Sequence, residues 1–308
     1  MRQVAIVGSG LIGRSWAIVF AQGGFNVALF DATPGVADKA CELAREGLHD
    51  LAGYGLVGDP AAAAGRLRVA ASLADALAQA NFVQENLPED LETKRAIFAE
   101  LDRLAAPDAI LASSTSTIVA SLFTASLPGR HRCLVAHPVN PPHLVPLVEL
   151  VGAPWTSRET IAKAQEVYEA VGQMPIVVRR EIEGFILNRL QAALLSEAFR
   201  LCGDGYVSPQ DLDKTLKGGL GLRWSFMGPF ETIELNAPGG IPDYCARYGA
   251  SLSRLSAADA AIYGGENLAR ILTEWPRQPT PGEIGAAMGR RDRRLAALTA
   301  HKRAQGAG

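Results

Sequence analysis

The sequence predicts an α/β fold, with a doubly wound sheet domain over residues 1–183 and an all-helical domain over residues 184–308. Three observations lead to this prediction. With 308 residues, the chain is longer than one hydrophobic core usually serves, so two domains are expected. Short β-rich runs alternate with helical patterns in the first part, which is typical of a parallel sheet with helices on both faces. Beyond Gly184 the pattern is helical and holds no convincing strand.

The sheet domain is predicted element by element from this alternation. Residues 4–8 form an unbroken apolar run, as a central parallel strand should. The helix predicted after it ends at a glycine pair, a usual stop signal. The predicted strands are residues 4–8, 26–31, 67–72, 81–86, 109–114, 132–138, 145–152 and 174–179. The predicted helices are residues 11–24, 34–53, 73–80, 90–105 and 157–171.

The helical domain opens with a long amphipathic segment. Apolar residues recur at near-helical spacing within residues 184–205, so a single long helix is expected there. The next helix is expected to begin at SPQD, residues 208–211. Ser208 supplies a hydroxyl N-cap, and Pro209 suits the first helical position.

Composition and charge exclude several classes of partner. Hydrophobic residues make up 48% and charged residues 20%, which is ordinary for a soluble globular protein. The net charge of −2 favours neither nucleic acid nor a membrane surface, and no apolar run approaches a membrane span. The N-terminus is better explained by a buried strand than by a signal peptide. Four cysteines lie far apart without a C-x-x-C pair, so we expect reduced thiols in a cytoplasmic protein and no metal site: Cys41, Cys133, Cys202 and Cys245.

The stretch GSGLIG carries the clearest functional signal. It is a G-x-G-x-x-G pattern that follows a predicted strand and opens a helix. Gly8 allows a tight turn, Gly10 lets the backbone approach a pyrophosphate, and Gly13 allows close packing of helix on strand. Leu11 and Ile12 open the helix, whose free N–H groups would face the phosphates. The sheet domain is therefore predicted to be Rossmann-like and to bind a dinucleotide.

Asp31 ends the second predicted strand and indicates which dinucleotide is bound. Its carboxylate can accept hydrogen bonds from both ribose hydroxyls of an adenosine, and its charge would repel a 2′-phosphate. The residues after it, Ala32, Thr33 and Pro34, offer no arginine to hold such a phosphate. NAD is therefore predicted in preference to NADP. The alternative is a plain glycine turn followed by a solvated aspartate.

AHPVNPPHLVPLVEL, residues 136–150, contains the candidate catalytic residues. His137 ends an apolar strand on the cofactor side and can act as a general base for an alcohol. Glu149, at the end of the next strand, is the best nearby carboxylate to orient it. Ser116, in SSTST after another strand, can donate to the substrate oxygen. Asn188 could close over the substrate from the second domain, and Asn140 is a further candidate for substrate contact.

Each of these roles has a structural alternative. A single histidine at a strand end is more often a satisfied structural residue, and a hydroxyl after a strand is usually an N-cap. Asn188 could simply hydrogen bond to a neighbouring helix.

At these residues the sequence resembles the short-chain L-3-hydroxyacyl-CoA dehydrogenase family over nearly the whole chain. Within the family it is most similar to the lambda-crystallin branch, which oxidises L-gulonate at C3. The stretches that carry the resemblance include VGSGLIGRSWA (7–17), LPEDLETK (87–94), SSTS (113–116), VAHPVNPPHLVPLVELV (135–151), GFILNRLQAALLSEAFRL (184–201) and GLGLRWSFMGPFETIELNAPGG (219–240).

The resemblance implies roles for the matching residues. His137 and Glu149 match the family's catalytic pair, and Ser116 and Asn188 match its substrate contacts. It also implies a Rossmann domain followed by a helical domain that makes a homodimer.

The resemblance further implies that Glu85 and Lys94, in ENLPEDLETK, contact the cofactor. Their place at the end of a strand agrees with this, because ligands of open α/β sheets sit at the strand carboxyl ends. The alternative is a strand-end carboxylate and a solvated helix lysine.

Two departures from the family pattern favour a small hydroxy acid over a CoA thioester. Pro138 and Val139 follow the catalytic histidine, where hydroxyacyl-CoA enzymes usually have two aromatics. Residues 41–66 are poorer in lysine than binding of CoA phosphates would favour. A small acid has a carboxylate that needs a cation, and Arg223 is the candidate, since guanidinium pairs bidentately with carboxylate. Arg223 could equally be a surface residue or part of a dimer salt bridge.

The expected activity is NAD-dependent oxidation of the 3-hydroxyl of a hydroxy acid such as L-gulonate. One alternative is an L-3-hydroxyacyl-CoA dehydrogenase, which runs the same chemistry on a thioester. Another is an NAD-binding protein that keeps the fold without the reaction, because fold alone does not imply function. The sequence does not identify the acid, since carnitine and 3-hydroxybutyrate dehydrogenases use similar folds and catalytic pairs.

Overall fold

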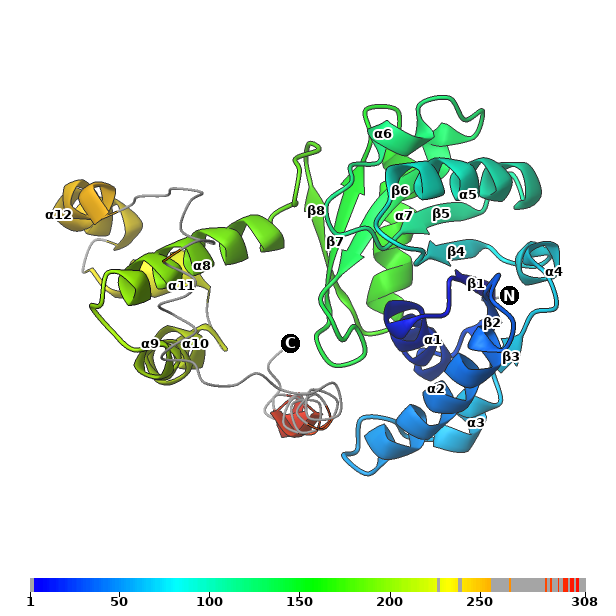
Figure 1. Ribbon diagram of the computed structural model, residues 1–308, viewed down its shortest axis with the longest axis horizontal. Helices are drawn as coiled ribbons and strands as arrows, with labels where there is room; N and C mark the ends of the chain where they lie inside the picture. The colour runs from blue at the N-terminus through cyan, green and yellow to red at the C-terminus, as the bar shows by residue number, and fades with distance from the viewer. Residues whose placement is uncertain are drawn as a thin grey trace. The chain divides into compact units, whose positions relative to one another are not determined.

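The chain forms two compact units in a computed structural model (Figure 1). The model describes residues 3–225, 228–237 and 240–255, together with residues 266, 286, 289, 293, 296–298, 300, 301, 303 and 304. The first unit comprises residues 1–188, 286–306 and 308, and the second comprises residues 189–285 and 307. The domain boundary expected after Glu183 stays a prediction.

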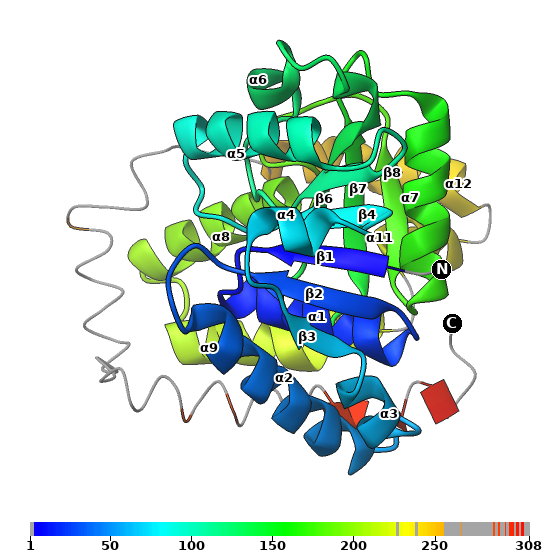
Figure 2. The same ribbon diagram turned by 90° about the vertical axis from the view of Figure 1, so that its right-hand side faces the viewer.

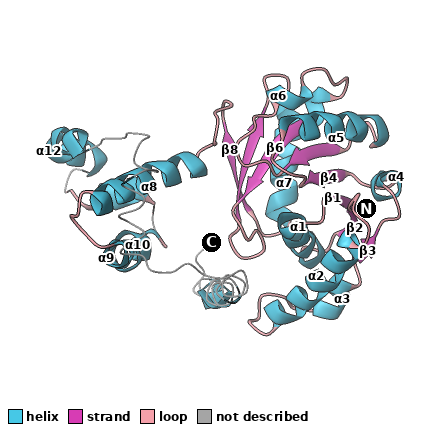
Figure 3. Cartoon of the chain, in the orientation of Figure 1, coloured by secondary structure: helices cyan, strands magenta, loops and turns pink. Residues whose placement is uncertain are grey.

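The first unit is built on a sheet in which eight strands are described (Figure 3). The strands are β1 (Gln3–Val7), β2 (Asn26–Phe30), β3 (Leu67–Val69), β4 (Phe82–Glu85), β5 (Ile110–Ser113), β6 (Cys133–Pro138), β7 (Leu147–Gly152) and β8 (Met174–Val178). The helices are α1 (Leu11–Gln22), α2 (Val36–Ala52), α3 (Pro60–Ala64), α4 (Leu73–Leu77), α5 (Leu91–Leu104), α6 (Ser121–Thr124) and α7 (Arg158–Ala170), with a single 3₁₀ turn at η1 (Arg130–Arg132).

The strands lie in the order β3-β2-β1-β4-β5-β6-β7-β8, which is the doubly wound arrangement that the sequence predicts. Strands β1 to β6 are parallel, so their carboxyl ends meet at one edge of the sheet. The prediction of a parallel sheet is wrong for one pair of strands, because β7 runs antiparallel to β6. The connection over residues 139–146 is shorter than the crossover of about a dozen residues that a parallel pair needs.

Helices cover both faces of this sheet, and alternate strand residues point to the two layers. Val4 and Ile6 of β1 pack with α1, α2 and α7, whereas Ala5 and Val7 pack with α4, α5 and α6. Figure 2 shows α1 and α2 on one side of β1 and β2, and α4 and α5 on the other side. The sheet is therefore buried on both faces, which explains its nearly continuous apolar runs.

The described residues of the second unit lie in helices and the turns between them. Helix α8 (Leu187–Gly203) begins in the first unit and continues into the second. The other helices are α9 (Pro209–Thr215), the π-helical turn η2 (Leu216–Leu220), α10 (Gly221–Trp224), α11 (Pro229–Leu235) and α12 (Gly240–Leu255). The predicted start of α9 is confirmed, because the Ser208 hydroxyl accepts a hydrogen bond from the Asp211 N–H at 3.1 Å. Within the described part of the chain, no helix is both long enough and apolar enough to cross a bilayer.

Candidate active site

The glycine-rich loop joins β1 to α1 at the carboxyl edge of the sheet. Gly8 has a φ of +84°, and a Cβ added there would lie 2.9 Å from the carbonyl carbon of Asn86. A Cβ on Gly13 would lie 2.0 Å from the Gly8 carbonyl oxygen, so the protein's own packing requires glycine at both positions. A Cβ on Gly10 would meet no described atom within 4 Å. The open space at Gly10 fits the close approach of a cofactor phosphate.

The N-terminus of α1 has the character of an anion site. No side chain caps it, and no acidic residue lies in its first turn. Its N–H groups and the helix dipole therefore favour a negative charge, as a dinucleotide pyrophosphate would supply. A cavity of about 290 Å³ beside the loop is lined by Gly10 and Leu11, and also by Arg14 and Lys39. Arg14, which the sequence-based prediction does not include, adds positive charge next to the loop, whereas the Lys39 ammonium is paired with Glu42 at 3.1 Å.

Asp31 follows β2 and is tied to the glycine loop. Its Oδ2 accepts a hydrogen bond from the Ser9 N–H at 2.8 Å, and its Oδ1 accepts one from the Thr33 N–H at 2.9 Å. Each carboxylate oxygen has two lone pairs, so both retain the capacity to accept a ribose hydroxyl. The half-buried side chain is thus tied to Ser9 in the glycine loop, and its contact with a ribose stays a prediction.

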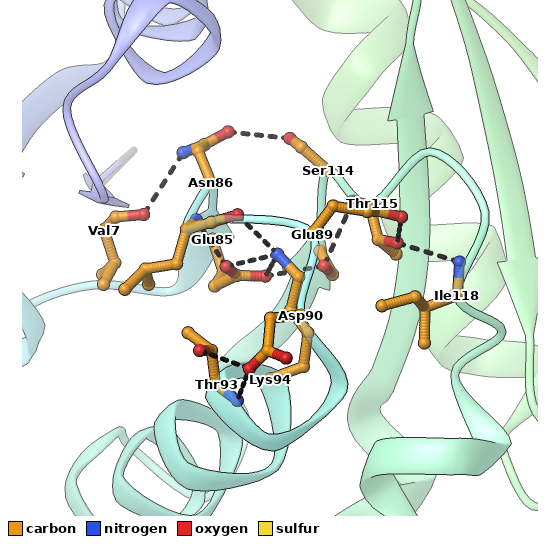
Figure 4. A network of polar contacts seen from close by, with 12 residues as sticks. Val7, Glu85, Asn86, Glu89, Asp90, Thr93, Lys94, Ser114, Thr115 and Ile118 are labelled. Carbon is orange, nitrogen blue, oxygen red and sulfur yellow. Dashed lines mark hydrogen bonds and ion pairs between the residues drawn. The ribbon is translucent and has the colours of Figure 1, made fainter.

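Glu85 and Lys94 meet each other under the end of β4 (Figure 4). Lys94 Nζ donates to both carboxylate oxygens of Glu85, at 2.7 and 3.0 Å, and to the Leu87 carbonyl at 2.8 Å. The Ser113 hydroxyl and the Leu87 N–H also donate to Glu85, each at 2.6 Å. Burial raises the pKa of the Glu85 carboxyl, while the Lys94 ammonium and these hydrogen bonds oppose that rise.

This pair is enclosed by the protein. The Lys94 and Glu85 side chains are 1% and 0% exposed, so the alternative of a solvated lysine is wrong. All three ammonium protons are taken by acceptors within the protein. In this structure the pair joins α5 to the ends of β4 and β5, and its direct contact with the cofactor stays a prediction.

Glu89 organises the loop that follows β5, and the sequence-based prediction missed it. Its Oε1 accepts hydrogen bonds from the Thr115 hydroxyl at 2.5 Å and from the Thr117 N–H and hydroxyl, both at 2.9 Å. The Ser116 N–H donates to Oε1 and Oε2 at 3.0 and 3.1 Å. Burial raises the pKa of Glu89, but these hydrogen bonds outweigh it and hold the pKa below its ordinary value. The one signal in the sequence is its position between β4 and the α5 N-cap Asp90.

Ser116 is held by its backbone, which leaves its side chain available. The main chain of Ser116 is fixed on one side by Glu89 and on the other by Asn188, whose Nδ2 donates to the Ser116 carbonyl at 2.8 Å. Among the described residues, none hydrogen bonds to the Ser116 hydroxyl, and the residue is exposed. The structure thus joins the Asn188 side chain to the backbone of Ser116, and contact of either side chain with substrate stays a prediction.

His137 and Glu149 face each other across the antiparallel pair β6–β7. They are direct partners in the strand register, so their side chains point to the same face. His137 Nδ1 lies 2.8 Å from Glu149 Oε2, and both side chains are buried. The antiparallel direction of β7, which the sequence-based prediction missed, is what places the carboxylate beside the imidazole.

The second oxygen of Glu149 is held by the start of α8. Oε1 accepts hydrogen bonds from the Ile186 N–H at 2.9 Å and the Leu187 N–H at 3.0 Å. Burial raises the pKa of Glu149, but the hydrogen bonds from His137, Leu187 and Ile186 outweigh it and hold the pKa below its ordinary value. An ionised carboxylate only accepts, so Nδ1 of His137 donates to it, and in the neutral imidazole Nε2 then has a free lone pair.

The two other predicted substrate contacts, Asn140 and Arg223, are both exposed. Asn140 lies in the connection after β6, where its side chain is exposed and its bond to Pro141 is cis. Arg223 lies in α10 of the second unit and is also exposed. Contact of either residue with substrate stays a prediction.

Models of the 3-hydroxyacyl-CoA dehydrogenase family match both parts of this chain. The model of its NAD binding domain matches residues 3–182, and the model of its C-terminal domain matches residues 184–262. The chain belongs to the 3-hydroxyacyl-CoA dehydrogenase family. The resemblance in the sequence motifs is thereby confirmed, and so is the prediction of an NAD-dependent oxidoreductase.

Three similar proteins show the range of the family. A lambda-crystallin homolog of Bos taurus is 48% identical over 256 residues, which span 82% of this chain and 79% of the relative. An L-carnitine dehydrogenase of Pseudomonas aeruginosa is 38% identical over 253 residues, which span 82% of this chain and 78% of the relative. The solved structure of an NAD⁺-dependent 5-formyl-3-hydroxy-2-methylpyridine 4-carboxylic acid 5-dehydrogenase superposes with a TM-score of 0.83, at 26% identity, over all of both chains.

Proposed function

We propose that this enzyme oxidises the 3-hydroxyl of a small hydroxy acid, with L-gulonate as the expected substrate and 3-dehydro-L-gulonate as the product. The observation that carries the proposal is the buried pair of His137 and Glu149, which lie 2.8 Å apart at the edge where the parallel strands end. Ligands of open α/β sheets bind at this edge. The residues suited to acid–base chemistry and the residues suited to NAD binding therefore lie at the same edge of the sheet in the first unit.

In the proposed mechanism His137 is the general base. Nε2 takes the proton of the substrate hydroxyl while the hydrogen on the same carbon leaves as hydride. The Nδ1–H bond to Glu149 keeps the imidazole in the tautomer that has Nε2 free, and the carboxylate stabilises the imidazolium that forms. The hydride would pass to the nicotinamide of bound NAD⁺, so the products would be a ketone, NADH and a proton on His137.

Ser116 and Asn188 are proposed to orient the substrate. The Ser116 hydroxyl can donate to the substrate oxygen, which fixes its lone pairs relative to the base. One N–H of the Asn188 amide is used on the Ser116 carbonyl, and its other N–H and its carbonyl oxygen can meet substrate hydroxyls. Substitution of either residue by alanine is expected to lower kcat/KM while the affinity for NADH stays unchanged.

The choice of a small acid rests on local chemistry and on the relatives. Pro138 and Val139 follow the base, where hydroxyacyl-CoA enzymes usually have aromatics. Residues 41–66 are poor in lysine and include Glu42, Glu46, Asp50 and Asp59, which disfavours binding of the phosphates of CoA. The relative at 48% identity is a lambda-crystallin homolog. We assign the carboxylate of the substrate to Arg223, so that Arg223→Met should raise KM for the acid and leave the NADH affinity unchanged.

The second candidate is an L-3-hydroxyacyl-CoA dehydrogenase, which the name of the family favours. The test measures initial rates of NADH formation with L-gulonate, L-3-hydroxybutyrate and L-carnitine, beside NADH consumption with acetoacetyl-CoA. Preference for L-gulonate supports the proposal. Preference for acetoacetyl-CoA would support the second candidate. Preference for L-carnitine would indicate the activity for which the 38% identical relative is named. Binding of NADH with no turnover of any of these compounds would mean a fold kept without the reaction.

The proposal includes a homodimer that forms through the second unit. Several large apolar side chains are exposed in its described part: Leu190, Tyr206, Phe230 and Leu255. Exposed apolar groups of this kind mark interaction surfaces. Sedimentation of the purified protein as a monomer at micromolar concentration would contradict the dimer. We also place the enzyme in the cytoplasm, because all four cysteines are free thiols.

A further inference from the structure

Phe185 has an unusual backbone conformation next to the catalytic pair. Its φ is +51°, and it is the one non-glycine residue with a positive φ in the described parts of the chain. This region is unfavourable for a bulky L-residue and persists only where the surroundings hold the residue in it. Strained backbone conformations of this kind are concentrated at functional sites. The contacts of Phe185 and its neighbours with the His137–Glu149 pair show what this conformation does.

The backbone of Phe185 directs two N–H groups at one carboxylate oxygen. Gly184, with a φ of +73°, and Phe185 are consecutive left-handed residues. The next two N–H groups, of Ile186 and Leu187, both donate to Glu149 Oε1, at 2.9 and 3.0 Å. This is the oxygen that His137 does not use. The left-handed turn therefore fixes the far side of the carboxylate that orients the base.

The side chain of Phe185 packs on the base itself. Its ring centroid lies 5.4 Å from the His137 ring centroid, with an angle of 48° between the planes. The Phe185 side chain is fully buried, and His137 is only 5% exposed. A ring in this position limits rotation of the imidazole and keeps water from the pair, which strengthens the imidazole–carboxylate interaction.

We propose that Phe185 is a positioning residue for the His137–Glu149 pair. Its side chain holds the imidazole, and its left-handed backbone holds the carboxylate. One residue thus controls both partners of the 2.8 Å contact. This inference rests on the proposed function, because it needs His137 to be the general base.

The chain offers a matched control for the side chain. Phe123 is also buried in the hydrophobic layer that contains Phe185, and its ring packs on Phe98 at 4.7 Å rather than on a catalytic residue. Loss of either ring should lower the melting temperature, since each leaves a cavity. Loss of the Phe185 ring alone should affect the chemistry.

The first test compares Phe185→Leu with Phe123→Leu. Phe185→Leu is expected to lower kcat by about ten- to a hundred-fold, the usual effect of a small misplacement of a catalytic group. Its affinity for NADH, measured by fluorescence titration, is expected to equal that of the wild type, and Phe123→Leu is expected to keep the wild-type kcat. Phe185→Met, of similar volume, serves if Phe185→Leu does not fold. Wild-type kcat in the folded variant would overturn the proposal.

A second comparison isolates the backbone. Phe185→Gly and Phe185→Ala both lack the ring, but only glycine adopts a positive φ without strain. Phe185→Gly is therefore expected to retain a higher kcat and a higher melting temperature than Phe185→Ala. Equal values in the two variants would contradict the role assigned to the left-handed turn.

A double variant separates failure of this inference from failure of the proposed function. If Phe185 acts through the base, Phe185→Leu in a His137→Ala background should change kcat by less than about twofold, because the two effects are not additive. Wild-type turnover by His137→Ala alone would overturn the proposed mechanism. Loss of turnover in His137→Ala together with normal kcat in Phe185→Leu would overturn only the role of Phe185.

Discussion

His137 and Glu149 are direct partners on antiparallel strands, and their side chains meet at 2.8 Å between Nδ1 and Oε2. The strand register brings them onto one face, and the N–H groups of Ile186 and Leu187 hold the other carboxylate oxygen. Both oxygens of Glu149 thus accept hydrogen bonds from fixed donors. The protein's own donors and strand register therefore fix the geometry of the pair, as the proposed proton transfer requires.

Glu149→Gln should disable the pair without disturbing the fold. A glutamine amide has one acceptor end, whereas the site offers donors at both carboxylate oxygens. Either the α8 N–H groups lose their acceptor, or the glutamine NH₂ faces His137 and favours the tautomer that has the proton on Nε2. We expect kcat to fall by about 10²- to 10⁴-fold with an unchanged NADH dissociation constant. A wild-type kcat in steady-state assays would show that the carboxylate has no part in the reaction.

The pH dependence of stability should differ between the wild type and Glu149→Gln. The pKa of Glu149 in the folded protein is below its ordinary value, because hydrogen bonds from His137, Leu187 and Ile186 outweigh the effect of burial. Its contribution to stability is therefore complete above the unfolded pKa of about 4.3, and it is lost as the pH falls through the folded pKa. The wild type should exceed the variant in unfolding free energy at neutral pH, and the difference should shrink below about pH 4.3. Urea denaturation at a series of pH values measures this, and a difference that grows on acidification contradicts it.

Gly10→Ala and Gly13→Ala should separate cofactor binding from folding. A Cβ at position 10 meets no described atom within 4 Å, and the φ of Gly10 is −64°, so the fold should tolerate alanine there. A Cβ at position 13 meets the Gly8 carbonyl oxygen at 2.0 Å and must displace α1 from β1. We expect Gly10→Ala to weaken NADH binding at a normal melting temperature and Gly13→Ala to lower the melting temperature. If Gly10→Ala binds NADH as tightly as the wild type, the loop does not approach the cofactor closely.

Lys94→Met should destabilise the first unit. It leaves the Glu85 carboxylate buried with hydrogen bonds from Ser113 and Leu87 but without its counter-ion. Breaking one side of a buried pair costs about 3–5 kcal/mol, and the double variant Glu85→Gln/Lys94→Met should recover part of this loss. Chemical denaturation measures both. An unfolding free energy like that of the wild type, combined with weaker NADH binding, would instead support direct contact of Lys94 with the cofactor.

Much of the fold was predictable because it depends on local patterns. The apolar run of β1, the glycine loop and the Ser208 cap all have local sequence signals, and the structure contains each of them. The direction of β7 was missed because an apolar run looks the same in either direction. The short connection over residues 139–146 was the available evidence for an antiparallel pair, since a parallel crossover needs more chain.

The contact between His137 and Glu149 was predictable from their residue types, whereas the residues that support it were not. Glu89 and Phe185 contact residues that are distant in the sequence, and the position of Glu89 between β4 and Asp90 does not identify its partners. Lys94 shows the same limit, because helix lysines are usually solvated and its burial depends on Glu85 in another element. The substrate contacts expected of Asn140 and Arg223 remain predictions.

The most direct test of the account is the rate of NADH formation by His137→Ala in a single turnover, with the hydroxy acid that the wild type oxidises fastest. An NADH titration of the same preparation confirms that the cofactor site is intact. We predict a rate about 10²- to 10⁴-fold below that of the wild type, the usual contribution of a general base. A single-turnover rate equal to that of the wild type would mean that another group takes the proton, and the central role of the His137–Glu149 pair would be wrong.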